Sequence, residues 1–246
     1  QAAELYERYL AHARNLDHRA EGLVLLAQAE AQGGNDRAAE AALAEAVSLG
    51  ARKGSRALGA DGRFAAAHAR YMQAERVLAK FDQIAIQGSV KQLKARLKQK
   101  TVLLNDAAKA LLDCVSMGVA EWTTASLYQI GHMYEAFAKS LRDSPPPPEV
   151  TTDDQKADYQ AQIEEFAVPM EERSLDAYEN GWKEADKLGI YNQWTAKMRD
   201  ALGRLNSELY PPFKETGFEV RSQAPLALPG LIEAPNRAVA ASTVKK

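Results

Sequence analysis

Residues 127–134 read Leu-Tyr-Gln-Ile-Gly-His-Met-Tyr, a stretch without proline in which large side chains surround one glycine. Leu127, Ile130 and Tyr134 recur at helical spacing, so they share one apolar face of a predicted helix. Gly131 lies in that face, where the missing side chain lets a second helix approach closely. The stretch therefore predicts a helix packed tightly against a neighbour.

The same spacing of large and small residues recurs along the chain. Further matches are Leu23-x2-Leu26-Ala27-x2-Glu30, Phe64-x2-Ala67-His68-x2-Tyr71 and, less completely, Leu175-x2-Tyr178-Glu179-x2-Trp182. A second pattern, an alanine followed by large or small apolar positions, is found at Ala2-x3-Tyr6-x2-Tyr9, Ala39-x3-Leu43-x2-Ala46 and Ala107-x3-Leu111-x2-Cys114. This recurrence predicts a chain built from repeated helical pairs.

Stop and capping residues divide the first part of the chain into hairpins. We expect a helix over 16–32, a stop at Gly33-Gly34, and a second helix from the N-cap Asn35 to Gly50. Residues 61–86 and 89–116 predict a long antiparallel hairpin, turned at Gln87-Gly88 and capped by Ser89.

Prolines organise the second part, since all ten lie between Pro145 and Pro235. Four of them, at 145–148, predict an extended insertion. Thr151 or Thr152 is expected to cap a helix that ends near residue 166, and Pro169 to open another that ends near 188. A last helix is expected over 191–208, followed by an extended tail with a short strand at 218–220.

Taken together, the patterns over residues 1–209 resemble the tetratricopeptide repeat (TPR) superfamily. Residues 187–195 with Leu209-Tyr210-Pro211 look like the last repeat of long bacterial envelope TPR proteins associated with gliding-motility machinery. The resemblance implies an all-α fold, a TPR-like right-handed α-solenoid of antiparallel helical hairpins, some elongated, with an irregular proline-containing tail. It implies hairpins over 1–142, a proline-rich insertion at 143–151, degenerate hairpins over 152–209 and a tail over 210–246.

What the TPR resemblance implies for function is a non-catalytic protein-protein interaction scaffold in a bacterial envelope complex. The compartment would be the periplasm or envelope, with the cytoplasm as the alternative, and the partners other proteins of the assembly. A second interpretation is a regulatory or ligand-sensing helical domain that binds a small molecule near Trp182 and Trp194. Whether Gln1 is a mature N-terminus or a fragment boundary stays open, as does the oligomeric state.

Composition argues against several other functions. With 31 basic and 33 acidic residues the net charge is −2, so we expect no nucleic-acid partner. No apolar run reaches the roughly 18 residues of a membrane span, which leaves peripheral membrane association open. The four histidines are scattered and no nucleotide, nucleophile or metal motif occurs, so we expect no catalytic residues, no metal and no cofactor.

A stripe in the helix of residues 127–134 is the first candidate binding surface. Tyr128, His132 and Glu135 share a face opposite the apolar one, and the first helix of a TPR hairpin lines the family's groove. We expect this stripe to grip an extended peptide or a partner helix. The alternative is that these side chains are solvated or covered by the protein's own tail.

A basic run is the second candidate surface. It comprises Lys91, Lys94, Arg96, Lys98 and Lys100, of which Lys91, Lys94 and Lys98 are expected to bind a partner. Anionic lipid, an acidic partner and a merely solvated helix face are its alternatives. Residues 149–176 carry nine acids against two bases and offer an internal counterpart.

The remaining unusual residues are expected to serve packing. Cys114, the only cysteine, is predicted to be an inert buried thiol, and the three tryptophans, Trp122, Trp182 and Trp194, to lie in apolar contacts. The apolar segment 225–232 in the tail is predicted to dock on its own last hairpin or on a partner.

Overall fold

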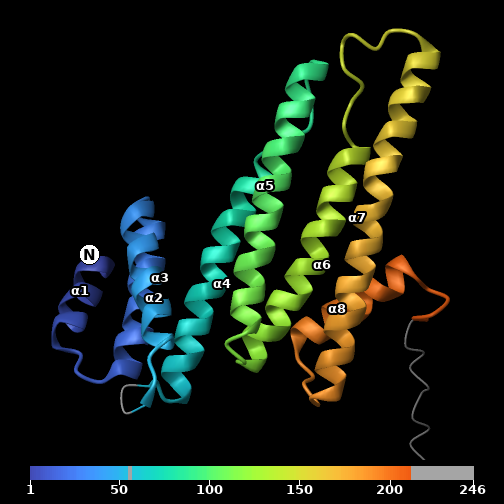
Figure 1. Ribbon diagram of the computed structural model, residues 1–246. Coiled ribbons are helices and arrows are strands. Elements are labelled where there is room, and N and C mark those ends of the chain that lie inside the picture. Colours follow the sequence, from blue (N-terminus) through green and yellow to red (C-terminus); the bar gives the residue numbers. More distant parts are fainter. Residues whose placement is uncertain (55–56, 212–246) are drawn as a thin grey trace, which may run out of the picture. The chain divides into compact units, whose positions relative to one another are not determined.

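A computed structural model of the chain describes residues 1–54 and 57–211, and this part forms eight α-helices and no strand (Figure 1). The helices are α1 (Ala2–His12), α2 (Leu16–Gln32), α3 (Asp36–Gly50), α4 (Ala60–Asp82), α5 (Val90–Val115), α6 (Ala120–Arg142), α7 (Asp153–Lys187) and α8 (Gln193–Leu205). The predicted all-α class is confirmed. The expected strand at 218–220 and the apolar segment 225–232 lie outside the described residues.

Residues 1–211 form one compact unit in which consecutive helices run in alternate directions (Figure 1). Within it, α2 packs against α1, α3 and α4, while α6 packs against α5, α7 and α8. One apolar cluster joins α1 to α4, a second joins α4 to α7, and a third lies where α6, α7 and α8 meet. The apolar core therefore continues past the proline-rich loop into α7.

Helices α2 and α3 begin and end where the sequence predicts. The Asn15 side chain accepts hydrogen bonds from the backbone N–H groups of Asp17 and His18, and the Asn35 side chain accepts one from Ala38. Gly34 ends the turn between α2 and α3 with a φ of 78°, a conformation that favours glycine. Ala27, which occupies the position of Gly131 in the repeated pattern, is fully buried.

The α4–α5 hairpin differs from the prediction in one respect, because α4 ends at Asp82 rather than near residue 86. Two cations of α5 satisfy the carbonyl groups that follow. Lys100 donates to the carbonyls of Phe81 and Ile84, and Arg96 donates to those of Ala85 and Gln87. These bonds hold residues 83–89 as a loop, after which Ser89 caps α5 with the reciprocal bonds of a capping box.

The prediction that Pro169 opens a separate helix is wrong. The helix α7 runs unbroken from Asp153 to Lys187, with Pro169 in its interior and Thr152 as its N-cap. Pro169 and Glu165 are both exposed, so water can satisfy the Glu165 carbonyl that lacks an N–H partner. Packing of the opposite face of α7 against α6 keeps the helix continuous.

The last helix is shorter than predicted, since α8 spans Gln193–Leu205 instead of 191–208. Asn192 caps it and also donates its side-chain amide to Glu121 and Thr124 at the start of α6. The indole N–H of Trp194 donates to the same Glu121 carboxylate at 2.8 Å. These bonds fix the beginning of α8 against the beginning of α6.

Candidate functional site

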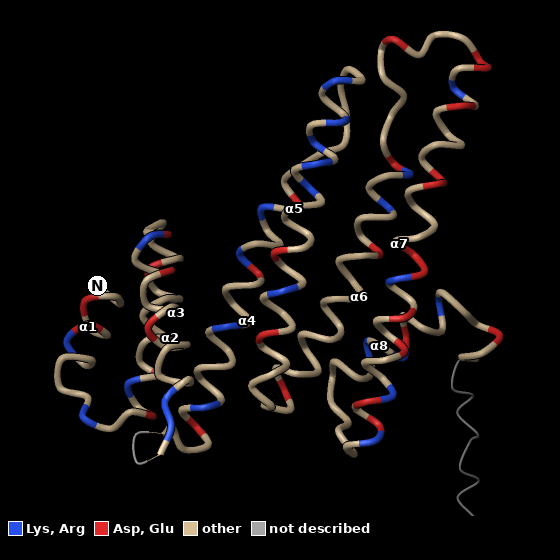
Figure 2. The backbone as a smooth tube through the Cα atoms, viewed as in Figure 1, with Lys and Arg blue, Asp and Glu red and all other residues tan. Residues whose placement is uncertain are grey.

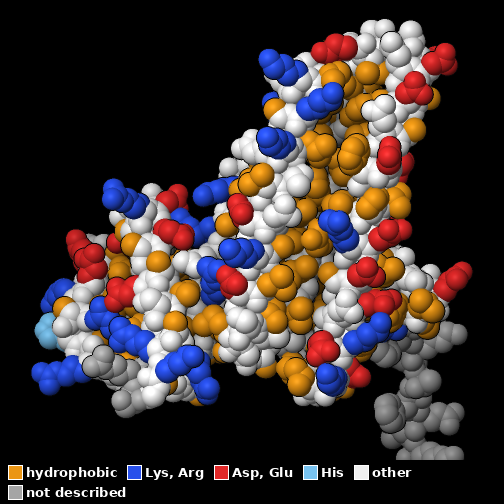
Figure 3. Space-filling model, viewed as in Figure 1, with side chains coloured by type: hydrophobic (Ala, Val, Ile, Leu, Met, Phe, Trp, Pro, Cys, Tyr) orange, Lys and Arg blue, Asp and Glu red, His pale blue; other side chains and the backbone are white. Residues whose placement is uncertain are grey.

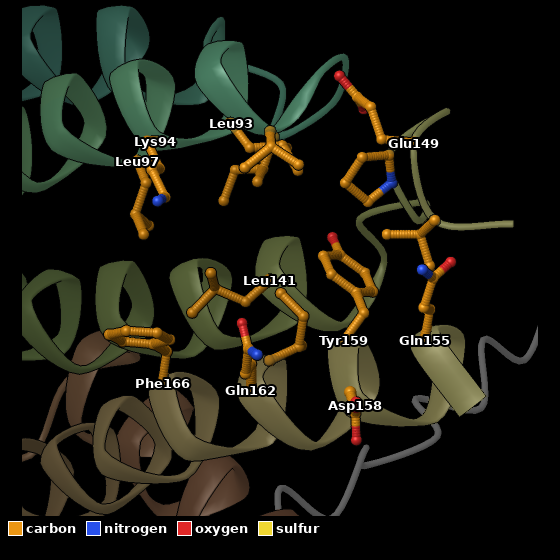
Figure 4. Close-up of a pocket in the computed structure, with 15 residues that line it drawn as sticks. Leu93, Lys94, Leu97, Leu141, Glu149, Gln155, Asp158, Tyr159, Gln162 and Phe166 are labelled. Carbon is orange, nitrogen blue, oxygen red and sulfur yellow. The ribbon is translucent and has the colours of Figure 1, made fainter. Parts of the chain in front are cut away.

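An open apolar cleft of about 450 Å³ lies between α5 and the α6–α7 pair (Figure 4). It begins where α6 ends, because both α5 and α7 carry apolar stripes that continue beyond Leu141 in the last turn of α6. In the close-up, Leu93 and Leu97 of α5 point across the cleft toward Leu141 and Phe166. The cleft is thus the space that a longer α6 would have filled.

Helix spacing explains why the walls are apolar. Val90, Leu93 and Leu97 recur at i, i+3 and i+7 on α5, and Tyr159, Ile163 and Phe166 at i, i+4 and i+7 on α7. The deep parts are well covered, with Leu141 at 2% and Ile163 at 8% exposure, whereas Phe166 at the mouth is 54% exposed. The cleft therefore presents large apolar side chains directly to the solvent.

The proline-rich loop between α6 and α7 closes one end of the cleft. Pro147, Glu149 and Val150 contribute to the lining, and Pro147 is buried. The Tyr159 hydroxyl donates to the Pro145 carbonyl at 3.3 Å and forms a further hydrogen bond with the Ser144 hydroxyl. These contacts from α7 tie down an insertion that has no helical hydrogen bonds of its own.

The two helices beside the cleft carry opposite charges in their N-terminal halves, basic on α5 and acidic on α7 (Figure 2). On the α5 side lie Lys91, Lys94 and Lys98, which are all exposed. On the α7 side lie the exposed Asp154 and Asp158, and Asp158 lines the cleft itself. Figure 3 shows the apolar surface as a band between the basic and the acidic side chains.

The five cations of the basic run of α5 lie on different faces of the helix, so some are exposed and others are covered. Lys91, Lys94 and Lys98 point to solvent, as expected for candidate binding residues, but Arg96 is half-buried and Lys100 is 3% exposed. The Lys100 ammonium also lies 4.1 Å from the centre of the Phe81 ring. Two of the five cations thus act inside the α4–α5 hairpin.

The expected internal pairing of basic and acidic segments is not found in the described part of the chain. No ion pair there joins α5 to the acids of residues 149–176. The partner of Glu164 and Glu171 is instead Arg142, at the end of α6. The apolar cleft lies between the lysines of α5 and the acids of α7 (Figure 3).

The structure places the stripe Tyr128, His132 and Glu135 beside α7 and α8. The Tyr128 ring lies 5.7–5.8 Å from the rings of His132, Tyr178 and Trp194. Glu135 accepts hydrogen bonds from the Tyr178 hydroxyl at 3.0 Å and from Arg204 at 2.7 Å. Only His132 is exposed, so much of this stripe is occupied by the protein's own helices.

Burial and hydrogen bonding act in opposite directions on the Glu135 carboxyl. Burial raises its pKa, but hydrogen bonds from Arg204 and Tyr178 and the positive charge of Arg204 outweigh burial and hold the pKa below the ordinary 4.5. Burial also raises the pKa of Tyr128. Glu135 is therefore a charged tie between α6, α7 and α8.

The residues expected to serve packing do so. Trp122 stacks on His68 at 4.1 Å, Trp194 lies 6.3 Å from Tyr71, and Trp182 packs in the cluster of α6, α7 and α8. Cys114 is fully buried, and burial raises the pKa of its thiol. These side chains stabilise the helix contacts.

The sequence contains a signal for the cleft that residue-by-residue reasoning missed. The apolar stripe of α5 begins at Val90 and that of α7 near Tyr159, yet the helix between them ends at Arg142. When the apolar stripes of two helices extend beyond the end of the helix that packs between them, an unfilled space is expected there.

Within residues 1–54 and 57–211, none of the helices combines the length and the apolarity that crossing a bilayer requires. The same residues hold no group of three or more His, Cys, Asp or Glu side chains arranged to bind a metal ion. Comparisons with protein-family models, with curated proteins and with solved structures gave no match for this chain.

Proposed function

We propose that this protein is a non-catalytic scaffold that binds a segment of another protein in the cleft between α5 and α7. The observation that carries the proposal is the open cleft of about 450 Å³, lined by apolar side chains of three helices and bordered by opposite charges. Apolar surface of this kind is stabilised when a partner covers it.

The lining favours binding over chemistry. It contains no histidine, cysteine or serine, and its charged residues Lys94, Glu149 and Asp158 are exposed at the borders. A general acid or base works best near the reacting atoms in a water-poor site, where burial adjusts its pKa. The cleft offers apolar contact at its centre and charge only at its edges, which is the layout of a protein-binding surface.

The cleft is preferred to the stripe of Tyr128, His132 and Glu135 as the main site. Glu135 is already bonded to Tyr178 and Arg204, and Tyr128 packs against Trp194. A peptide bound at that stripe would have to replace these contacts, whereas the cleft is open. His132 is the one residue of the stripe left accessible for an additional contact.

The wider context of the proposal comes from the sequence resemblance. The helical repeats favour a TPR-like right-handed solenoid, and the C-terminal match favours an assembly of the bacterial envelope, with motility machinery among the candidates. The close approach of α6 and α7 at Gly131 supports the TPR interpretation, because that position requires a small residue in the family pattern.

A second candidate function is the binding of a small apolar molecule. The cleft volume of about 450 Å³ falls within the roughly 300–1,000 Å³ of small-molecule sites. The expected location near Trp182 and Trp194 gains no support, since both side chains pack against their own chain. Thermal-shift screening separates the two functions, because stabilisation by metabolites without a protein partner favours the ligand site.

Substitution of Phe166 tests the scaffold. Its ring lines the mouth and is 54% exposed, so Phe166→Asp is expected to weaken partner binding without unfolding α7. The control is Val168→Asp, which changes an exposed apolar residue of the same helix outside the lining. Quantitative co-purification should lose partners with Phe166→Asp only; equal retention by both variants would exclude the cleft as the binding site.

A further inference from the structure

The α5 border of the cleft is a row of lysines without ion-pair partners. Lys91, Lys94 and Lys98 are spaced i, i+3 and i+7, so they share one face of α5. All three are exposed, and none makes an ion pair within the described part of the chain. The face lies beside the apolar stripe of the same helix, and Lys94 itself lines the cleft.

The α7 border carries the opposite charge in the same way. Asp154, Asp158 and Glu165 fall on one face of α7, at i, i+4 and i+11, and all are exposed. Among the described residues none of them makes an ion pair, although Lys156 is nearby and pairs with Asp153. A ligand in the cleft would therefore meet positive charge along one edge and negative charge along the other.

The cleft is long enough for two to three turns of a helix, but its volume is too small to enclose the whole helix. The stretch of α7 from Gln155 to Phe166 rises about 16 Å. A cavity left by removing one leucine side chain is about 150 Å³, so 450 Å³ accommodates roughly three large side chains. The apolar stripe of a bound helix therefore fits in the cleft, while the rest of that helix lies across the mouth.

Backbone hydrogen bonding favours a helical ligand. The walls are helices with no free strand edge, so an extended peptide would find no ladder partners there. Its N–H and C=O groups would face apolar side chains at a cost. A helix satisfies these groups internally and places residues i, i+3 or i+4 and i+7 into the cleft.

We propose that the ligand is an amphipathic helix of a partner protein whose apolar stripe is flanked by acids on one side and by bases on the other. The acids face Lys91, Lys94 and Lys98 of α5, and the bases face Asp154, Asp158 and Glu165 of α7. Because reversing a helix exchanges its flanks, the two charged borders also set the direction in which the ligand lies. This inference rests on the scaffold function proposed above.

Synthetic peptides of about 15 residues test the inference directly. Three peptides share one leucine stripe and carry acids on one flank and bases on the other, acids on both flanks, or bases on both. The mixed peptide should bind the intact chain about tenfold more tightly than either uniform peptide, with a gain of helical circular dichroism. The preference should shrink at high salt, since exposed charges are screened.

Charge reversal on α5 supplies the second arm. The double variant Lys94→Glu/Lys98→Glu should now prefer the peptide with bases on both flanks. The single variant Lys94→Glu is compared with Lys109→Glu, a matched change at an exposed lysine of α5 outside the cleft, which should leave the preference unaltered.

The outcomes separate this inference from the scaffold proposal. Equal affinity for all three peptides, or binding without a gain of helix, overturns the inference but leaves the cleft as a binding site. Binding to anionic vesicles that Lys94→Glu abolishes, with no binding of any peptide, assigns the basic border to a membrane surface and also overturns it. If Phe166→Asp in addition leaves partner co-purification unchanged, the scaffold function fails as well.

Discussion

A Cβ atom on Gly131 would lie 2.5 Å from Cδ1 of Tyr178, so a side chain at this position would require the Tyr178 ring to shift. The Ser174 hydroxyl donates to the Gly131 carbonyl at 2.9 Å in the same contact, and Tyr178 is fully buried. The pair joins the two helices that form one side of the cleft. The position of this crossing therefore fixes where the part of α7 that extends beyond the end of α6 lies relative to α6.

Gly131→Ala should destabilise the protein by about 1–3 kcal/mol, because the added methyl group must displace the Tyr178 ring. An alanine in a helix would otherwise be favourable. Gly33→Ala is the control, since the nearest atom to its Cβ would be 3.5 Å away. Urea unfolding measures both variants; a stable Gly131→Ala protein would show that the crossing can relax.

Glu135→Gln should reduce the unfolding free energy by about 1 kcal/mol at neutral pH, a modest value because the side chain of Arg204 is 61% exposed. The carboxylate's pKa is held below 4.5 in the folded state. Its stabilising contribution is therefore present above pH 4.5 and is lost as the pH falls through the lowered pKa.

Unfolding of wild type and Glu135→Gln across this acid range checks the sign. The two proteins should converge in stability as the pH falls. Glu172→Gln, at an exposed carboxylate without an ion pair in the described part of the chain, should stay within about 0.5 kcal/mol of wild type. A difference that grows toward acid pH would contradict the assignment.

Lys100→Ala should cost about 2 kcal/mol, because the buried ammonium satisfies the carbonyls of Phe81 and Ile84 where α4 ends. Burial lowers the pKa of Lys100, which is consistent with an ammonium group removed from water. Lys98→Ala removes an exposed lysine of α5 and should change stability by less than about 0.5 kcal/mol. Similar denaturation midpoints for the two variants would show that the end of α4 does not need these bonds.

Pro169→Ala should stabilise the protein by about 2 kcal/mol. The substitution restores an N–H that can bond to the Glu165 carbonyl, and alanine is the better helix former. The gain is reduced because proline also restricts the unfolded chain. Thermal unfolding measures it, with Val168→Ala as the neighbouring control; a loss of stability would mean that α7 depends on the proline.

Cys114 should react slowly with thiol reagents in the native protein. Its side chain is fully buried, and burial raises the pKa of the thiol, so little thiolate is present. Ellman's reagent at mildly alkaline pH should label it at the rate of local opening, and rapidly in concentrated urea. Fast labelling of the folded chain would show that the contact between α4 and α5 opens readily.

The helices themselves could be predicted because their signals are local. Four helices begin at residues whose side chains accept hydrogen bonds from nearby backbone N–H groups, namely Asn15, Asn35, Ser89 and Thr152. The turn after α2 requires a left-handed φ, which Gly34 supplies. The prediction failed at Pro169, where the preference of the isolated residue is overridden by packing of the opposite helix face against α6.

The candidate site could be predicted only in part. The sequence predicts Lys91, Lys94 and Lys98 as binding residues, but it does not predict that the Lys100 ammonium turns inward to the carbonyls of Phe81 and Ile84. The stripe of Tyr128 and Glu135 has the right spacing, yet Tyr178 and Arg204 reach it from helices more than 40 residues away. Such contacts depend on helix crossings that no local pattern records.

By itself, the sequence determined the all-α class, most helix boundaries and the close approach at Gly131, because these follow from capping, periodicity and side-chain size. Only the tertiary structure decided that α6 ends at Arg142 between two helices whose apolar stripes continue. The cleft is a property of relative helix positions rather than of any one helix. The lysines of α5 and the acids of α7 become its two borders only because α5 and α7 face each other across it.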